Sequence, residues 1–215
     1  MSAVTICDSS AREHIADRWV HVLGLGLGLP AALGVVVVAA LGGAQGQLAP
    51  VALYAAGLLA MLGCSAAYHL RRASTRRDWL RRLDHAAIFA MIAGTYTPFT
   101  LKLERAWALG LTSAIWALAA AGIAAKLVRL RPDRLHGISV ALYLVLGWIG
   151  LLALGPFMAS LGAPTLALLA AGGALYTAGV VFHLWQRLPY QNAIWHGFVL
   201  AAAGVHYAAV LTVLG

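Results

Sequence analysis

Seven long apolar runs divide the sequence, and short polar breaks separate them. The runs cover about 19–42, 50–70, 83–101, 106–127, 135–157, 164–185 and 191–213. Each run is close to the roughly 20 residues that an α-helix needs to cross the hydrocarbon core of a bilayer. The pattern therefore predicts an all-α membrane protein with seven transmembrane helices.

The breaks between the runs are rich in residues that end helices. The clearest are Gly42-Gly43 through Pro50, Arg131-Pro132-Asp133, Gly155-Pro156 through Pro164 and Leu188-Pro189-Tyr190. Gly and Pro at such positions favour turns over continued helix. No stretch resembles a linker, a second folded domain or an internal repeat. We therefore expect one transmembrane domain over 19–215, preceded by a polar segment over 1–18.

The polar N-terminal segment carries a pattern typical of a helix start. Ser10 and Glu13 have the spacing of a capping box, in which the two side chains bond to free backbone amides. This predicts a short interfacial helix over about 10–18 that leads into the first apolar run. The segment lacks the basic end and short apolar core of a cleaved signal peptide. The first run is accordingly expected to act as an uncleaved signal anchor.

The composition supports a membrane protein and excludes several other classes. Hydrophobic residues make up 62% of the chain, charged residues make up 10%, and the mean hydropathy is +0.84. A soluble globular domain of this composition would lack a water-facing surface. The two cysteines, Cys7 and Cys64, argue against a disulfide framework and against a zinc site built on thiolates.

The net charge of +8 is concentrated in the short segments between the runs, which argues for topology signalling rather than nucleic-acid binding. With the N-terminus in the cytoplasm, thirteen of the 15 basic residues are inside, and only Lys102 and Arg105 are outside. The inside residues are Arg12, Arg18, Arg71, Arg72, Arg76, Arg77, Arg81, Arg82, Lys126, Arg129, Arg131, Arg134 and Arg187. Positive residues favour the cytoplasmic side. The sequence thus predicts a multi-pass inner-membrane protein with a cytoplasmic N-terminus and an external C-terminus.

This topology places the histidines of the runs, with one exception, at the cytoplasmic ends of helices, together with Ser65, Asp84 and Asn192. They are His21, Ser65, His69, Asp84, His85, His136, His183, Asn192 and His196. His206 is the exception, about 15 Å deeper than His196 along its helix. Ionisable side chains at such depths are costly and are functional candidates by default.

Spacing and chemistry together suggest a metal site among these residues. Residues four apart share a helix face, so Ser65 and His69 can face one point, as can Asn192 and His196. Neutral imidazole and carboxylate are suitable zinc ligands. Any single one of these histidines is more simply explained as a helix cap or a headgroup contact. His69, Asp84 and His196 taken together favour a metal.

Several motifs then carry a recognisable pattern. They are SxxxH at Ser65–His69, LDHAAIFAMIAGTYTPF at 83–99, AIWHGFVLAAAGVH at 193–206, and the N-terminal residues Glu13, Ala16 and His21. This pattern resembles the bacterial hemolysin III family, which is related to the progestin and adipoQ receptors and more distantly to the alkaline ceramidases. The resemblance covers essentially the whole chain. It implies seven membrane helices, a cytoplasmic N-terminus and a zinc site near the cytoplasmic face.

The resemblance also implies roles for particular residues. His69 and His196 correspond to zinc ligands, and Asp84 corresponds to an aspartate that usually holds a zinc-bound water. The first histidine of the HxxxH motif in the last helix is here Asn192. An amide oxygen is a weaker zinc ligand than an imidazole.

The substitution at Asn192 leaves four possibilities open. Asn192 supplies a weak oxygen ligand, Asp84 binds zinc directly, His85 or His183 takes the vacant place, or the chain binds no metal.

Two functions follow from the resemblance, and a third from the family name. The first is a role in membrane lipid and fluidity homeostasis, with membrane lipids as partners. The alternative is a zinc-dependent intramembrane hydrolase of lipid amides, in which Asp84 is the general base and Ser65 donates a hydrogen bond to the oxyanion. A pore-forming haemolysin is less favoured, because a chain this apolar cannot travel through water. The basic loop Arg71–Arg82 could attract anionic headgroups, although topology signalling alone explains it.

Overall fold

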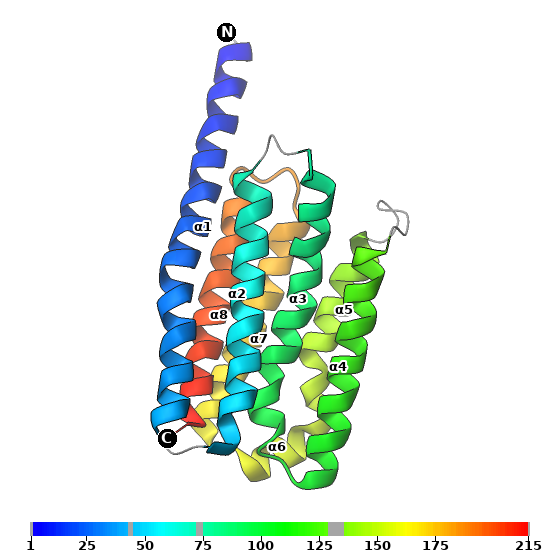
Figure 1. Ribbon diagram of the computed structural model, residues 1–215. Coiled ribbons are helices and arrows are strands. Elements are labelled where there is room, and N and C mark those ends of the chain that lie inside the picture. The colour runs from blue at the N-terminus through cyan, green and yellow to red at the C-terminus, as the bar shows by residue number, and fades with distance from the viewer. Residues whose placement is uncertain (1, 43–44, 72–74, 129–135, 215) are drawn as a thin grey trace.

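The computed structural model describes residues 2–42, 45–71, 75–128 and 136–214, which form helices and no strand. The helices are α1 (Ser2–Leu41), α2 (Leu48–Leu70), α3 (Arg77–Thr100), α4 (Arg105–Leu127), α5 (His136–Trp148), α6 (Leu154–Ser160), α7 (Ala163–Leu184) and α8 (Gln191–Thr212), with short 3₁₀ segments η1 (Gln45–Gln47) and η2 (Ile149–Ala153). Figure 1 shows the long helices side by side in one bundle, with the start of α1 extending beyond it. The predicted all-α class is confirmed.

Within the described residues, six segments are long and apolar enough to cross a membrane. They are Ala11–Leu41 of α1, α2, α4, the continuous segment Gly137–Ser160, α7 and α8. The third predicted span, α3, is outside this group because it is less apolar: its first two turns carry five charged side chains, and its last turns contain Thr95, Tyr96, Thr97 and Pro98. α3 is instead the helix with the longest buried stretch, and it packs against α2 and α4. The chain is a multi-pass helical protein, and a seventh span remains a prediction.

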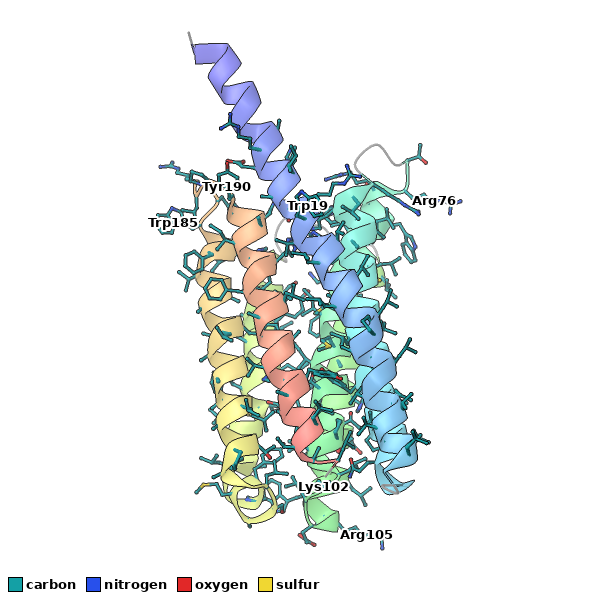
Figure 2. The ribbon with its side chains drawn as sticks, turned by 90° about the vertical axis from the view of Figure 1, so that its left-hand side faces the viewer. Trp19, Arg76, Lys102, Arg105, Trp185 and Tyr190 are labelled. Atoms are coloured by element: carbon teal, nitrogen blue, oxygen red, sulfur yellow. The ribbon has the colours of Figure 1, made fainter. Side chains whose placement is uncertain are left out.

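The two ends of the bundle differ in charge, in the direction that the sequence predicts. Figure 2 shows Arg76 at the end that also carries Trp19, Trp185 and Tyr190, whereas Lys102 and Arg105 lie at the opposite end. Aromatic side chains of this kind favour the boundary between lipid and water. Which end faces the cytoplasm stays a prediction from the charge count.

The close approach of α2 and α3 depends on two glycines. A Cβ atom at Gly57 would lie 2.9 Å from the carbonyl oxygen of Ala90, and one at Gly94 would lie 2.9 Å from that of Leu53. Small residues let membrane helices pack backbone against backbone. Because these two contacts hold the helices together along their length, the last turn of α2 and the first turns of α3 lie beside each other at one end.

The predicted helix start at Ser10 is wrong. Helix α1 begins at Ser2 and continues without a break to Leu41, so Ser10 lies inside it. The eight residues before Ser10 that belong to the helix contain no Gly or Pro to end it. A capping pattern marks a helix start only where the residues before it are not themselves helical.

The fifth apolar run is not one regular helix. The α-helical geometry ends at Trp148, changes to the 3₁₀ segment η2, and resumes in α6. The Tyr96 hydroxyl, from α3, donates to the carbonyl oxygen of Gly147 at 2.5 Å and accepts from the amide of Gly150 at 3.1 Å. One side chain thus replaces helix bonds that the 3₁₀ geometry leaves open.

Two of the predicted breaks can be compared with the structure in detail. The break over Leu188-Pro189-Tyr190 lies between α7 and α8, as expected. The break predicted from Gly155 to Pro164 contains α6, so the real interruption is Leu161–Gly162. Pro156 is tolerated there because it lies in the first turn of α6, where no backbone amide needs an intrahelical partner. The Arg131-Pro132-Asp133 break lies outside the described residues.

Candidate metal centre

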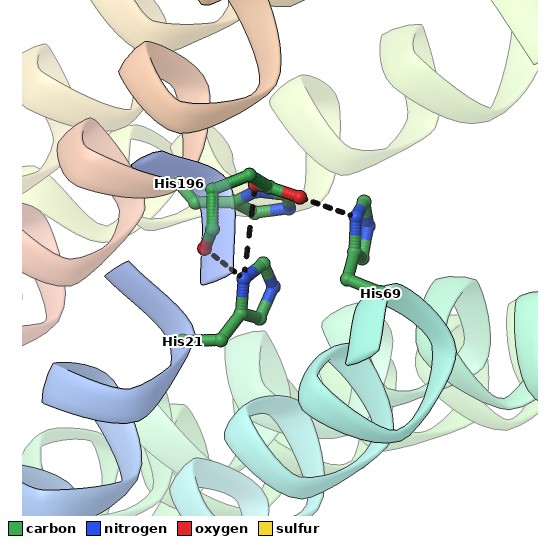
Figure 3. A group of neighbouring side chains, drawn as sticks. His21, His69 and His196 are labelled. Carbon is green, nitrogen blue, oxygen red and sulfur yellow. Dashed lines mark hydrogen bonds and ion pairs between the residues drawn. The ribbon is translucent and has the colours of Figure 1, made fainter. Parts of the chain in front are cut away.

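Four ligand-type side chains from three helices meet at one end of the bundle. Asp17 and His21 come from α1, His69 from the last turn of α2, and His196 from the second turn of α8. One ligand atom of each lies within 4.8 Å of the others, and Figure 3 shows the three imidazoles facing one another. Their side chains are between 5% and 15% exposed. Helix α1 packs against both α2 and α8, which brings the four together.

Asp17 is the centre of this cluster. Its carboxylate oxygens accept hydrogen bonds from Nδ1 of His69 at 3.0 Å and from Nδ1 of His196 at 2.8 Å. Its backbone carbonyl accepts from Nδ1 of His21 at 2.8 Å. A carbonyl and an ionised carboxylate can only accept, so each Nδ1 carries the proton. In a neutral imidazole, the lone pair is then on Nε2.

This pattern fits a metal with imidazole ligands. Metal-binding histidines usually donate their second ring N–H to a carboxylate or carbonyl, which fixes the tautomer and the ring orientation. Asp17 gives that support to all three imidazoles at once. The rings also pack on one another, with centroids 4.4 to 4.7 Å apart. Three imidazoles are a ligand set that zinc accepts, with a fourth position left open.

Ser65 and Asp84 lie directly beside the cluster. Ser65 Oγ is 3.1 Å from Nε2 of His21, and the side chains of Ser65 and Asp84 are hydrogen-bonded. Ser65 therefore connects the carboxyl group of Asp84, from α3, to an imidazole of the cluster. Asp84 is not one of the four grouped residues, so the structure places it next to the ligand-type atoms rather than among them.

Asn192 lies one helical turn before His196 and is exposed. It lines the main cavity and also a small polar pocket of about 100 Å³, whose other lining residues include Glu13, His14 and Asp17. The third imidazole of the cluster is His21, from α1, instead of a residue at position 192.

His85 and His183 line the main cavity but do not belong to the cluster. The His183 ring packs on Trp195, with centroids 4.8 Å apart. His206 lies deeper, where its Nε2 donates to the carbonyl oxygen of Leu169 at 3.3 Å. The side chain of His136 is outside the described part of the structure.

Sequence reasoning identified His69 and His196 but missed Asp17. Asp17 was not singled out within the polar N-terminal segment, and His21 was placed at a cytoplasmic helix end and in a motif but not among the metal ligands. The available signal was their spacing, because Asp17 and His21 are four residues apart, as are Ser65 and His69. Residues at this spacing share a helix face.

The cluster lies at one end of a partly open cavity of about 590 Å³. His21, His69 and His196 line this end together with Ser65 and Asp84. The lining continues along α3 as far as Phe99, and apolar side chains of other elements face it, such as Leu144 of α5, Leu151 of η2 and Leu166 of α7. The volume is within the roughly 300–1,000 Å³ that is usual for small-molecule sites.

Fold and cluster define a multi-pass helical membrane protein with a group of side chains that can hold a metal ion. Residues 10–207 match the family model described as "Haemolysin-III related", and the chain belongs to this family. It is 34% identical over 201 residues to the Hemolysin-3 homolog of Bacillus subtilis (strain 168), covering 93% of each chain. Identity to Hemolysin-3 of Bacillus cereus is 34% over 203 residues, 93% of this chain and 91% of the relative. The human monocyte to macrophage differentiation factor is 30% identical over 208 residues, 92% of this chain and 83% of the relative.

Proposed function

We propose that this protein binds zinc at the Asp17–His21–His69–His196 cluster and acts in membrane lipid and fluidity homeostasis, in the bacterial inner membrane. The observation that carries the proposal is the position of the cluster at the end of a largely apolar cavity. A metal ion at this position would lie next to a lipid that occupies the cavity.

The roles of the residues follow from their hydrogen bonds. His21, His69 and His196 would hold zinc through Nε2, because Asp17 occupies each Nδ1. His21 would thus supply the imidazole that is missing at Asn192. When bound, zinc acidifies a coordinated water and polarises a carbonyl oxygen. Asp17 keeps the three rings oriented and supplies negative charge beside the ion.

Deletion of the gene should change the physical state of the membrane, because the proposed role is in lipid homeostasis. We expect a shift in membrane order, measured by the fluorescence anisotropy of a membrane probe, together with a changed acyl-chain composition. Wild-type protein should restore both, and the His196→Ala variant at equal expression should not. A deletion strain with unaltered membrane order and acyl composition would contradict the proposal.

Hydrolysis of a lipid amide is a second candidate, and the contact between Ser65 and Asp84 favours it. The partly buried carboxyl group of Asp84 lines the same cavity as His69 and His196. Asp84 would accept a proton from a water held beside the imidazoles. The Ser65 hydroxyl would donate a hydrogen bond to the developing oxyanion, or keep its neighbours in place.

The Asp84→Asn variant separates this candidate from the first. Loss of a general base should reduce lipid-amide turnover by about 10²–10⁴-fold, while zinc content and the thermal unfolding temperature stay close to the wild-type values. Turnover is measured as fatty acid released from an amide-linked lipid in detergent. The matched control is Asp78→Asn, an exposed carboxylate on the same helix. Full turnover in Asp84→Asn would exclude the mechanism.

A further inference from the structure

Three basic side chains line the main cavity at the same end as the metal cluster. They are Arg77 and Arg81, from the first turns of α3, and Lys126, from the last turn of α4. Among the described residues that line this cavity, Asp84 supplies the one carboxylate. The charged lining of the cavity therefore has an excess of positive charge at this end.

These side chains are held at the cavity by specific contacts. The Lys126 amine donates to the hydroxyl of Ser139 on α5, which also lines the cavity. The Arg77 guanidinium lies over the ring of Tyr68, 4.9 Å from its centroid. A neighbouring residue, Arg82, donates to the carbonyl oxygen of Leu127 at 3.3 Å, and so fastens the start of α3 to the end of α4.

Within the described residues, the positive charges of Arg81 and Lys126 are weakly compensated. Arg81 has an ion pair with Asp78 at 3.8 Å, but the Asp78 side chain is 84% exposed. Exposed pairs of this kind contribute about 0–1 kcal/mol. Arg81 also lies close enough to Lys126 for their positive charges to repel. An anion between them would relieve that repulsion and accept charge-assisted hydrogen bonds from both.

The rest of the cavity is lined mainly by apolar side chains. Below the basic group, the lining follows α3 through Ile88 and Ile92 to Phe99. At a rise of 1.5 Å per residue, the distance from Arg77 to Phe99 is about 33 Å. Such a cavity favours a hydrocarbon chain along most of its length.

We infer that the cavity binds an amphiphile with an anionic carboxylate or phosphate head, which Arg77, Arg81 and Lys126 hold, and with an acyl chain directed toward Phe99. This inference rests on the proposed function in so far as both take the cavity as a lipid site. It adds the charge of the headgroup: neutral lipids of equal chain length bind more weakly.

Topology signalling does not require these contacts. A basic residue that only orients a membrane protein needs to be on the correct side, and Arg187 meets that requirement without lining the cavity. The comparison between Lys126 and Arg187 therefore separates headgroup binding from general surface charge.

The test is a titration of purified full-length protein in neutral detergent, with bound lipid measured by native mass spectrometry. The probes share a palmitoyl chain: palmitate, lysophosphatidic acid and the neutral monoacylglycerol. Wild-type protein should bind at least one anionic probe about tenfold more tightly than the neutral one. Preference for palmitate identifies a carboxylate head, and preference for lysophosphatidic acid identifies a phosphate head.

The variants Lys126→Gln and Arg81→Gln should each remove most of this preference and leave monoacylglycerol affinity unchanged. Glutamine at 126 can still bond to Ser139, which protects the packing of α4 on α5. Arg187→Gln is the matched control and should behave as wild type. Equal affinity for all three probes, or equal losses in Arg187→Gln and Lys126→Gln, would overturn the inference.

The same titration on His196→Ala distinguishes this inference from the proposed function. Anionic selectivity that persists in a chain without zinc, or in a wild-type protein shown to hold none, supports the headgroup site independently of the metal. Zinc binding without anionic selectivity refutes the headgroup site alone.

Discussion

Alanine at His196 or at His69 should abolish stable zinc binding. Purified wild-type protein is expected to hold about one zinc per chain, and each variant less than a tenth of that after dialysis against a weak chelator. Each substitution removes one of three Nε2 donors and one of the two hydrogen bonds that orient Asp17. Loss of a supporting group alone costs roughly 10–100-fold in metal affinity, so loss of a ligand costs more. Elemental analysis by mass spectrometry measures the metal content.

The matched control is His206→Gln, which removes an imidazole from the same helix about 15 Å away from His196. Glutamine can still donate to the carbonyl oxygen of Leu169, so the bundle should remain folded. Its zinc content should equal that of the wild type, and circular dichroism should show the same helix content in all variants. Wild-type zinc content in both His69→Ala and His196→Ala would show that the cluster is not a zinc site.

The helices could be predicted because a single periodic property of the chain determines them. Runs of about 20 apolar residues must satisfy their backbone hydrogen bonds internally in a membrane, which leaves helix as the available structure. The break at Trp148 could not be predicted in this way. It depends on the Tyr96 hydroxyl, which lies about 50 positions earlier in the chain and reaches Gly147 and Gly150 only after α3 has packed.

The candidate site also contains residues that could be predicted from the sequence and a residue that could not. His69 and His196 are prominent in the sequence because an imidazole in an apolar run is costly and therefore conspicuous. Asp17 is not conspicuous, since it lies within a polar segment that contains other acidic residues. Its importance arises from the register of α1 against α8, which brings it to a histidine 179 positions away. That register depends on side-chain packing between two helices, and hydropathy alone does not specify it.

The position of Asp17 leads to a second large expected effect. Asp17→Asn should lower zinc affinity by about 10–100-fold, which corresponds to about 1.4–2.8 kcal/mol. An asparagine side chain has one acceptor oxygen, and its amide group donates. The single oxygen of the asparagine can therefore accept a hydrogen bond from Nδ1 of His69 or from Nδ1 of His196. It cannot offer each of them a separate oxygen, as the carboxylate does. The imidazole that loses its partner is free to rotate, and the negative charge beside the ion disappears.

Competition with a chromophoric zinc chelator measures this change in affinity. Glu13→Gln is the matched control: it removes a carboxylate one turn earlier on the same face of α1, in the small polar pocket. It should bind zinc as the wild type does. Adding Asn192→His to Asp17→Asn should recover part of the lost affinity, because it places a fourth imidazole one turn from His196. If Asp17→Asn binds zinc as tightly as the wild type, then Asp17 does not orient the three rings, and the hydrogen bonds that it accepts have only a structural role.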